Sequence, residues 1–386
     1  MLKQIGRNNQ RYMVSNFLFA LGTGLWLNLR PLFLADLGAQ PEQIGLALAF
    51  GGISAGIIPI PAGILSDRFG PRRVIIFAWV IALIGAVIMA LASTWQIAAV
   101  GIFIWSLTWA ANPAITSFVV LSMPPEMRGA NMEKAFSWIF RVWPFAMLFS
   151  PALGGWIADR FSIQTDIWLS AVIFLLAIIV FWSANEVKTE QRPEKFQVRK
   201  LFKNKEYWVF VGFFGFLALS QQIGFTLLPN FLKDVGNFSQ GTIGTLYSVS
   251  FLGTFLGNVL IARVRPRTAF LIFIAASWIG MVLLLLFKSP LAAWLAFLLF
   301  GSLTAMWLLK AAGNGRIVSA EIQGIAFGLV ESITFIAMSV SSAVAGMLYG
   351  LTPGHTLPLL VSVVSIPAAF LGWLFVMRPI TGEPPK

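Results

Sequence analysis

The chain has 386 residues, of which 58% are hydrophobic and only 11% are charged. Soluble globular proteins are about 45–50% apolar and about 25% charged, so this composition excludes a water-soluble enzyme and predicts an integral membrane protein. The formal net charge of +12 must then be explained by where the basic residues lie along the chain.

Two residue types that carry much protein chemistry are scarce. Cysteine is absent, which excludes disulfides, thiolate nucleophiles and cysteine-ligated metals, and His355 is the only histidine. We therefore expect no enzyme activity, no catalytic or metal site and no cofactor.

Twelve apolar stretches are long enough to cross a bilayer, whose hydrocarbon core requires about 20 apolar residues per helix. The predicted fold is an all-α integral membrane protein with twelve transmembrane helices. In chain order, the stretches cover residues 12–37, 42–66, 72–94, 95–122, 129–158, 165–184, 206–233, 239–262, 266–288, 290–318, 322–350 and 355–378.

Segment 185–205 separates two groups of six spans. It is highly charged, so we predict a cytoplasmic linker between an N-terminal six-helix bundle (1–184) and a C-terminal six-helix bundle (206–386). Most basic residues fall on the linker's side of the predicted membrane, and the positive-inside rule places both termini in the cytoplasm. A multi-pass protein of the cell (inner or plasma) membrane explains the charge, and no nucleic-acid partner is expected.

The two groups of six spans resemble each other. Segments of the first group recur in the same order in the second: 30–38 at 228–236, 44–45 at 243–244, 65–73 at 260–268 and 126–129 at 321–324. Two parallel repeats of six helices predict a cavity between pseudo-symmetric halves near the bilayer midplane, with halves that rock about it in alternating access.

The connection between the second and third spans reads GILSDRFGPRR. It matches every specified position of G-x-x-x-D-[RK]-x-G-x-[RK]-[RK] and so resembles the signature loop of the major facilitator superfamily. The resemblance covers the whole chain and implies a secondary transporter; the alternative for the loop alone is a positively charged anchor. The resemblance assigns a conformational latch to Gly63, Asp67, Arg68, Gly70, Arg72 and Arg73.

The fifth span carries a second, partial resemblance. Residues 150–155 read SPALGG, similar to the G-P-x-x-G-G signature of that superfamily's proton-linked exporters. This implies proton antiport and close packing between the halves by Pro151, Gly154 and Gly155, because small residues let helices approach closely. The fourth span lacks the basic residue typical of those antiporters, so direction and coupling stay open.

Ionisable residues at membrane depth are candidates for a functional site, because each costs about 2.5–3.5 kcal/mol at a helix centre. Arg30 and Arg141 fall at a similar predicted depth on spans that are neighbours in the family. We predict that they bind an anionic or polar group of a small organic solute; the alternative is that each pairs with a backbone carbonyl or a buried acid. Further polar candidates for the solute are Asn28, Asn112, Trp109, Gln221 and Gln222.

Lys310 and Glu331 lie on consecutive spans of the second half at similar predicted depths. A buried ion pair between them is the less costly way to keep either charge in hydrocarbon. Glu331 is also the candidate for carrying a coupling proton, because burial favours the neutral form of a carboxyl group; a permanent structural pair is the alternative. Glu133 and Lys134, nearer the cytoplasmic surface, are predicted to be a surface pair.

The sequence as a whole predicts a secondary-active transporter that moves a small organic solute by alternating access, with proton-coupled export as the leading mode. Uptake or facilitated transport of an organic anion at Arg30 and Arg141 is the first alternative. A membrane receptor or scaffold that does not transport is the second. The expected partners are the lipid bilayer, the solute and protons, and the protein is expected to act as a monomer.

Overall fold

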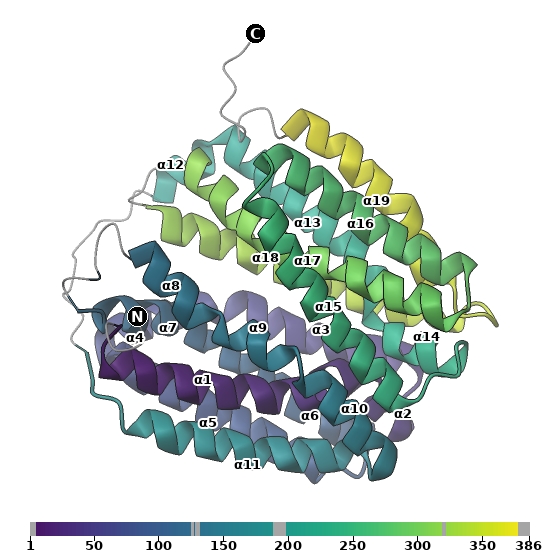
Figure 1. Cartoon of the computed structure of the whole chain (residues 1–386), viewed down its shortest axis with the longest axis horizontal. Coiled ribbons are helices and arrows are strands. Elements are labelled where there is room, and N and C mark those ends of the chain that lie inside the picture. The colour runs from purple at the N-terminus through teal and green to yellow at the C-terminus, as the bar shows by residue number, and fades with distance from the viewer. Residues whose placement is uncertain (1–4, 125–126, 128–131, 188–197, 319–321, 377–386) are drawn as a thin grey trace. The chain divides into compact units, whose positions relative to one another are not determined.

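The structure is a computed structural model that describes residues 5–124, 127, 132–187, 198–318 and 322–376 (Figure 1). The helices in the first half of the chain are α1 (Arg7–Trp26), η2 (Leu27–Leu29), α2 (Arg30–Asp36), α3 (Pro41–Ile57), α4 (Pro59–Phe69), α5 (Pro71–Ala90), α6 (Trp95–Ser106), η3 (Leu107–Ala110), α7 (Ala111–Leu121), α8 (Met132–Phe140), α9 (Val142–Met147), α10 (Ser150–Arg160) and α11 (Ile163–Trp182). Those in the second half are α12 (Val198–Lys203), α13 (Lys205–Thr226), α14 (Leu228–Asp234), α15 (Gln240–Ile261), α16 (Pro266–Leu286), α17 (Pro290–Ile317), α18 (Gln323–Gly350) and α19 (Leu357–Val376).

The predicted all-α membrane fold is confirmed. Within the described residues, nine helical segments are long and apolar enough to cross a membrane. The three remaining predicted spans are also helical: 42–66 corresponds to α3 and α4, 129–158 to α8, α9 and α10, and 355–378 to α19.

Several spans are divided into shorter helices, and prolines explain the divisions. A proline has no backbone N–H and its ring clashes with the carbonyl four residues earlier, so it fits best in the first turn of a helix and disrupts the helix elsewhere. In five divided spans, the later helix has a proline among its first three residues. These prolines are Pro31 in α2, Pro59 in α4, Pro113 in α7, Pro151 in α10 and Pro229 in α14.

The contacts divide the chain into two compact units. The first comprises residues 1–39, 53–193 and 239–248, and the second comprises 40–52, 194–238 and 249–386. Each unit therefore contains the first turns of one helix from the other half of the sequence: α15 starts in the first unit and α3 starts in the second.

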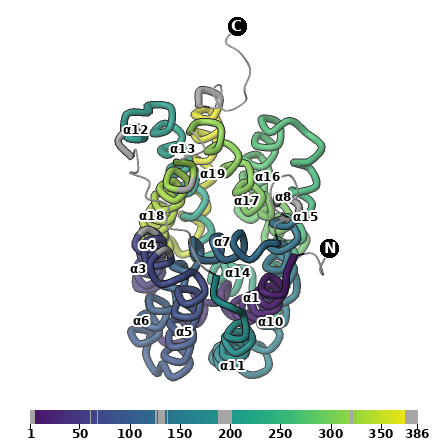
Figure 2. The backbone as a smooth tube through the Cα atoms, turned by 90° about the vertical axis from the view of Figure 1, so that its left-hand side faces the viewer, coloured from purple at the N-terminus to yellow at the C-terminus, as the bar shows by residue number. Residues whose placement is uncertain are grey.

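The same helix pairings recur inside both units. In the first unit α11 packs against α1 and α5, and α5 packs against α6. Figure 2 shows α5 and α6 side by side. In the second unit α19 packs against α13 and α16, and α16 packs against α17. Large aromatic side chains fill both cores, for example Trp79 and Phe174 in the first and Phe270 and Trp373 in the second. The internal repeat found in the sequence is thus also a repeat of packing.

Candidate functional site

A buried ion pair joins α17 to α18 in the second unit. Lys310 Nζ lies 2.5 Å from Glu331 Oε1, and the two side chains are only 8% and 22% exposed. The ammonium group also lies 5.9 Å from the centroid of the Phe214 ring of α13, within the range of a cation–π contact. The ion pair predicted from the sequence is present, whereas its role in proton coupling stays a prediction.

The two glutamines proposed as solute ligands lie farther along α13. Gln221 Nε2 donates to Ser277 Oγ of α16 at 3.2 Å, so its amide helps to join α13 to α16. Gln222 Nε2 contacts Thr226 Oγ1 one turn later at 3.3 Å, and that hydroxyl lies 3.2 Å from Ser342 Oγ of α18. Each amide thus already has one polar partner within the second unit, and solute binding by either stays a prediction.

Arg30 stands at the break between α1 and α2, and the break explains its main contact. Pro31 cannot donate to the carbonyl of Leu27, which is four residues earlier. Arg30 Nε donates to that same oxygen at 2.9 Å, so the guanidinium replaces the missing backbone N–H. The sequence left open whether Arg30 binds a solute or pairs with a backbone carbonyl. A backbone carbonyl does bind it, but this bond uses only one of the five N–H donors of the guanidinium.

The rest of the Arg30 guanidinium faces aromatic groups. Its Cζ lies 6.0 Å from the centroid of the Trp105 ring, and the phenol of Tyr247 in α15 is close enough to interact with its charge. Sequence reasoning missed Tyr247, because its chain position gives no sign that the start of α15 belongs to the first unit.

The other predicted ligands of the first unit lie in different local settings. Arg141 is exposed at the junction of α8 and α9 and stacks on Trp138, with Cζ 5.5 Å from the ring centroid. Asn28, in η2, and Trp109, in η3, are half-buried, and Asn112, at the start of α7, is exposed. Arg30 and Arg141 thus contact different aromatic rings, and their joint binding of a solute stays a prediction.

The basic end of the signature loop contacts the end of α11. Glu186 Oε1 accepts from the backbone N–H of Arg72 at 3.2 Å, and Glu186 Oε2 lies 3.7 Å from Arg73 Nε. The Arg72 guanidinium donates to the carbonyl of Trp182 at 2.5 Å and stacks on its ring. Gly70 has φ +89°, a backbone conformation that glycine adopts without strain. Sequence reasoning missed Glu186, because it placed this residue in the charged linker.

Two further latch residues, Arg68 and Gly63, have fewer contacts among the described residues. Arg68 is exposed and lies over the ring of Phe69, with Cζ 5.3 Å from its centroid. Among the described residues, a Cβ on Gly63 would meet only Pro113, at 3.9 Å. The side chain of Asp67 lies outside the described residues, as do those of Glu133 and Lys134, so these predictions stay untested.

The small residues of α10 pack against two helices. A Cβ on Gly154 would lie 2.6 Å from Leu25 Cα of α1, and one on Gly155 would lie 3.0 Å from Gly241 Cα of α15. Both distances are too short for a side chain, so only glycine fits either contact. The backbone oxygen of Pro151 meets Gly244 of α15. Gly154 therefore packs inside the first half of the chain, whereas Gly155 and Pro151 contact a helix of the second half.

The start of α3 makes the equivalent contact with α18 inside the second unit. A Cβ on Gly45 would lie 2.8 Å from Gly346 Cα, and one on Gly52 would lie 3.3 Å from Ser339 Cβ. Gly45 and Gly244 are the two copies of one repeated sequence position. The repeat thus places a glycine against a glycine of the opposite sequence half in both copies.

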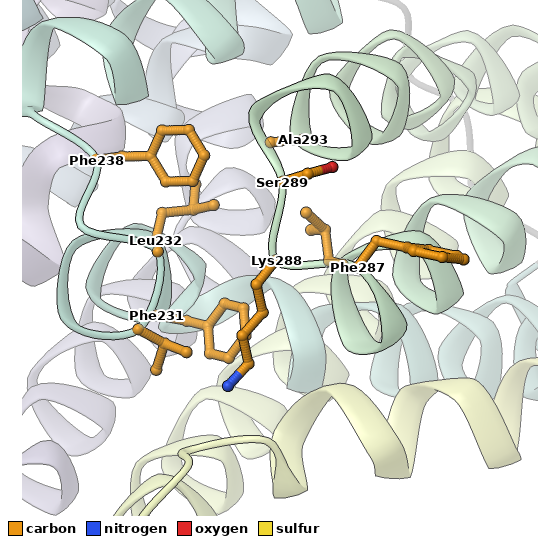
Figure 3. Close-up of a pocket in the computed structure, with 10 residues that line it drawn as sticks. Phe231, Leu232, Phe238, Phe287, Lys288, Ser289 and Ala293 are labelled. Atoms are coloured by element: carbon orange, nitrogen blue, oxygen red, sulfur yellow. The ribbon is translucent and has the colours of Figure 1, made fainter.

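A small pocket in the second unit contains none of the predicted site residues. It is lined by α14 and the residues after it, and by the connection from α16 to α17, where Lys288 supplies the charged group (Figure 3). Its other walls are largely apolar, including Phe231, Leu232 and Phe287.

Comparison with known proteins identifies relatives that are named as transporters or resistance proteins. The chain is 30% identical over 215 residues to an uncharacterized transporter of Buchnera aphidicola subsp. Schizaphis graminum, an alignment that spans 54% of this chain and 50% of that protein. It is 23% identical to the class B tetracycline resistance protein of Escherichia coli over 376 residues, covering 90% of this chain and 88% of the other.

Solved structures show the same fold at low identity. The crystal structure of a mutant form of the nucleoside transporter NupG covers 97% of this chain with a TM-score of 0.79 and 17% identity, and all of that chain is matched. A D-xylose–proton symporter matches with a TM-score of 0.76 and 16% identity, over 97% of this chain and 99% of that one. The family model described as "Major Facilitator Superfamily" matches residues 12–307. This multi-pass membrane protein therefore belongs to the Major Facilitator Superfamily of transporters.

Proposed function

We propose that the protein moves a small organic solute across the bacterial inner membrane by alternating access, as a proton-coupled exporter. The observation that carries the coupling is the ion pair of Lys310 and Glu331. Relatives named for tetracycline, quinolone and multidrug resistance support export as the direction.

The chemistry of the ion pair suits a coupling step. Two charges taken out of water are stable only while they neutralise each other, and separating them leaves a buried charge at high cost. When Glu331 binds a proton, its carboxyl group becomes neutral and no longer requires the ammonium group beside it. Separating the two side chains then leaves no buried unpaired negative charge. Protonation of Glu331 would thus release α17 from α18, which links proton binding to a movement of helices.

Alternating access also requires helix contacts that separate and re-form. The glycine contacts of α3 with α18 and of α10 with α15 have this property, because backbone surfaces without interlocking side chains separate with little repacking. In this proposal the bundles are residues 1–184 and 206–386, joined by the linker 185–205, with both termini in the cytoplasm. The signature loop would serve as a latch on the cytoplasmic side.

Purified protein in liposomes tests the proposal. A thermal-stabilisation screen with tetracycline and a quinolone, organic compounds in the names of relatives, would first select a solute. We expect a pH gradient to drive flux of that solute. Glu331→Gln should abolish gradient-driven flux and keep solute exchange, whereas the exposed acid variant Glu206→Gln should behave as wild type.

Two outcomes would contradict this assignment. Gradient-driven flux that survives in Glu331→Gln would remove the ion pair from the coupling step. A solute that stabilises the protein but never crosses the membrane would favour the receptor alternative.

Uptake of an organic anion is the second candidate function, and Arg30 is the observation that favours it. No carboxylate of the described residues lies within ion-pair distance of this guanidinium, and only Nε bonds the backbone. A carboxylate or phosphate of a solute would suit the free donors. Arg30→Gln should then weaken binding of anionic solutes more than of neutral ones, while the exposed Arg160→Gln should not.

A further inference from the structure

One buried acidic side chain of the first unit has no role in the proposed transport mechanism. Asp166 lies in the first turns of α11, a candidate membrane span, and is 0% exposed. Among the described residues neither of its carboxylate oxygens has a hydrogen-bond partner. An ionised carboxylate in such a place is strongly disfavoured, because it has lost water and gained no donor.

The contacts of Ser170 show which way Asp166 faces. Ser170 Oγ donates to the carbonyl of Gly22 in α1 at 2.7 Å, so this side of α11 faces α1. Asp166 is four residues earlier and therefore lies on the same side. α1 and α11 run antiparallel, because Arg11 near the start of α1 binds Ser183 just after α11. This register places Asp166 level with residues 26–28.

The groups at that level offer little to an ionised carboxylate. The indole N–H groups of Trp26 and Trp105 are both buried without a partner among the described residues, and their rings lie 5.1 Å apart. The amide of Gln164 already donates to the carbonyls of Ala90 and Ala92. The backbone N–H of Thr165 is bonded by the hydroxyl of Ser162. The polar hydrogens near the start of α11 thus either have other acceptors or remain unpaired.

No counter-ion in the described part of the chain reaches this level. The helices packed against α11 are α1, α5 and α10. The titratable groups of α1 and α5 lie at the C-terminal end of α11, far from Asp166. Each of them contacts residues 181–186 or is adjacent in sequence to a residue that does: Arg7, Arg11, Tyr12, Arg72 and Arg73. On α10, Asp159 accepts from the backbone N–H of Gly241, and the exposed Arg160 stacks on Trp156. Arg30, one turn beyond Trp26, bonds the carbonyl of Leu27 instead.

We propose that Asp166 is a proton-binding site: its carboxyl group is held as a neutral acid within the contact between α1 and α11, apart from the pair of Lys310 and Glu331. The ligand is a proton, and the site loses it when water reaches this contact. Proton concentration would therefore set the strength of packing between α1 and α11, whatever solute the protein carries.

The pH dependence of unfolding tests this site without a solute. A buried neutral acid is protonated in the folded chain but ionises in the unfolded chain above about pH 4, so stability falls as pH rises, by up to about tenfold in the folding equilibrium per pH unit. We expect the unfolding temperature of the purified protein to fall between about pH 5 and about pH 8, and Asp166→Asn to lack that part of the fall. The exposed carboxyl variant Asp159→Asn should retain it.

If Asp166→Asn does not fold, infrared spectroscopy of the wild type tests whether the carboxyl group of Asp166 is protonated in the folded protein. Aspartate labelled with carbon-13 reports on only five residues of the chain. We expect a labelled C=O band of a protonated carboxyl group to persist at about pH 7, well above the ordinary pKa of an aspartate side chain. Loss of every such band by about pH 6 would overturn the proposal. So would an Asp166→Asn variant that folds and keeps the full pH dependence of the wild type.

Discussion

The close contact between α10 and α1 predicts a specific penalty for adding one methyl group. A Cβ on Gly154 would lie 2.5 Å from the carbonyl carbon of Leu25 and 2.6 Å from its Cα. Carbon atoms in contact are normally about 3.5–4.0 Å apart, so the two helices would have to separate by about 1 Å. The obstacle is backbone, which cannot rotate aside, and overpacking of this kind costs about 1–3 kcal/mol.

Gly212→Ala is the matched control for Gly154→Ala. No atom of the described part of the chain lies within 4 Å of a Cβ at Gly212, which is exposed on α13. Alanine is favoured over glycine inside a helix by about 1 kcal/mol, and this term is common to both variants. Their difference in unfolding free energy is therefore the overpacking term. Tryptophan fluorescence during heating should show a lower unfolding temperature for Gly154→Ala than for Gly212→Ala; equal temperatures would refute the reasoning.

Three further predictions concern the charged contacts. Single removal of either partner, by Lys310→Met or Glu331→Gln, should destabilise the protein by about 3 kcal/mol, the lower end for a buried pair because Glu331 is partly exposed. The double variant should lose less than the sum, which a double-mutant cycle of unfolding measures; additivity would contradict the pair. Glu186→Gln should cost about 1 kcal/mol or less, because its partners are exposed, and high salt should remove the effect. Gly70→Ala should lower the unfolding temperature more than Glu186→Gln does, since a left-handed φ adds strain to a Cβ placed 2.6 Å from Glu186 Oε1.

The fold could be predicted because hydropathy, charge and repetition are properties of the sequence itself. Span lengths follow from the bilayer, so the twelve apolar stretches needed no tertiary information. The repeat predicted that Gly45 and Gly244 are equivalent, and both lie against glycines in the structure. What composition could not predict is which helix each small residue contacts, so Gly154 was expected between the halves but packs on α1.

The site was less predictable, because the roles of ionisable groups depend on partners far away in sequence. Depth counted along two adjacent spans was sufficient to pair Lys310 with Glu331. The same counting grouped Arg30 with Arg141, yet it ignored that Pro31 leaves a carbonyl free within reach of Arg30. Sequence reasoning missed Asp166 because it lies one residue inside a predicted span. An acidic residue is common in the first turn of a helix and so does not by itself indicate a buried site.

Cross-linking tests the central claim of alternating access most directly. The chain has no cysteine, so two introduced thiols have no other thiol of the same chain with which to form a disulfide. A Cβ on Gly52 would lie 3.3 Å from Ser339 Cβ, and one on Gly224 would lie 3.1 Å from Ser362 Cβ. Both distances are slightly below the about 3.5–4.5 Å that a disulfide spans, so a small shift of either helix allows the bond. The first pair joins α3 to α18 across the sequence halves, whereas the second joins α13 to α19 within one half.

Flux of the solute selected by the stabilisation screen would be measured before and after oxidation of each cysteine pair. We expect oxidation of the cysteine pair at positions 52 and 339 to stop flux and reduction to restore it, whereas the protein with cysteines at 224 and 362 should transport in both states. Undiminished flux through protein cross-linked between α3 and α18 would contradict it.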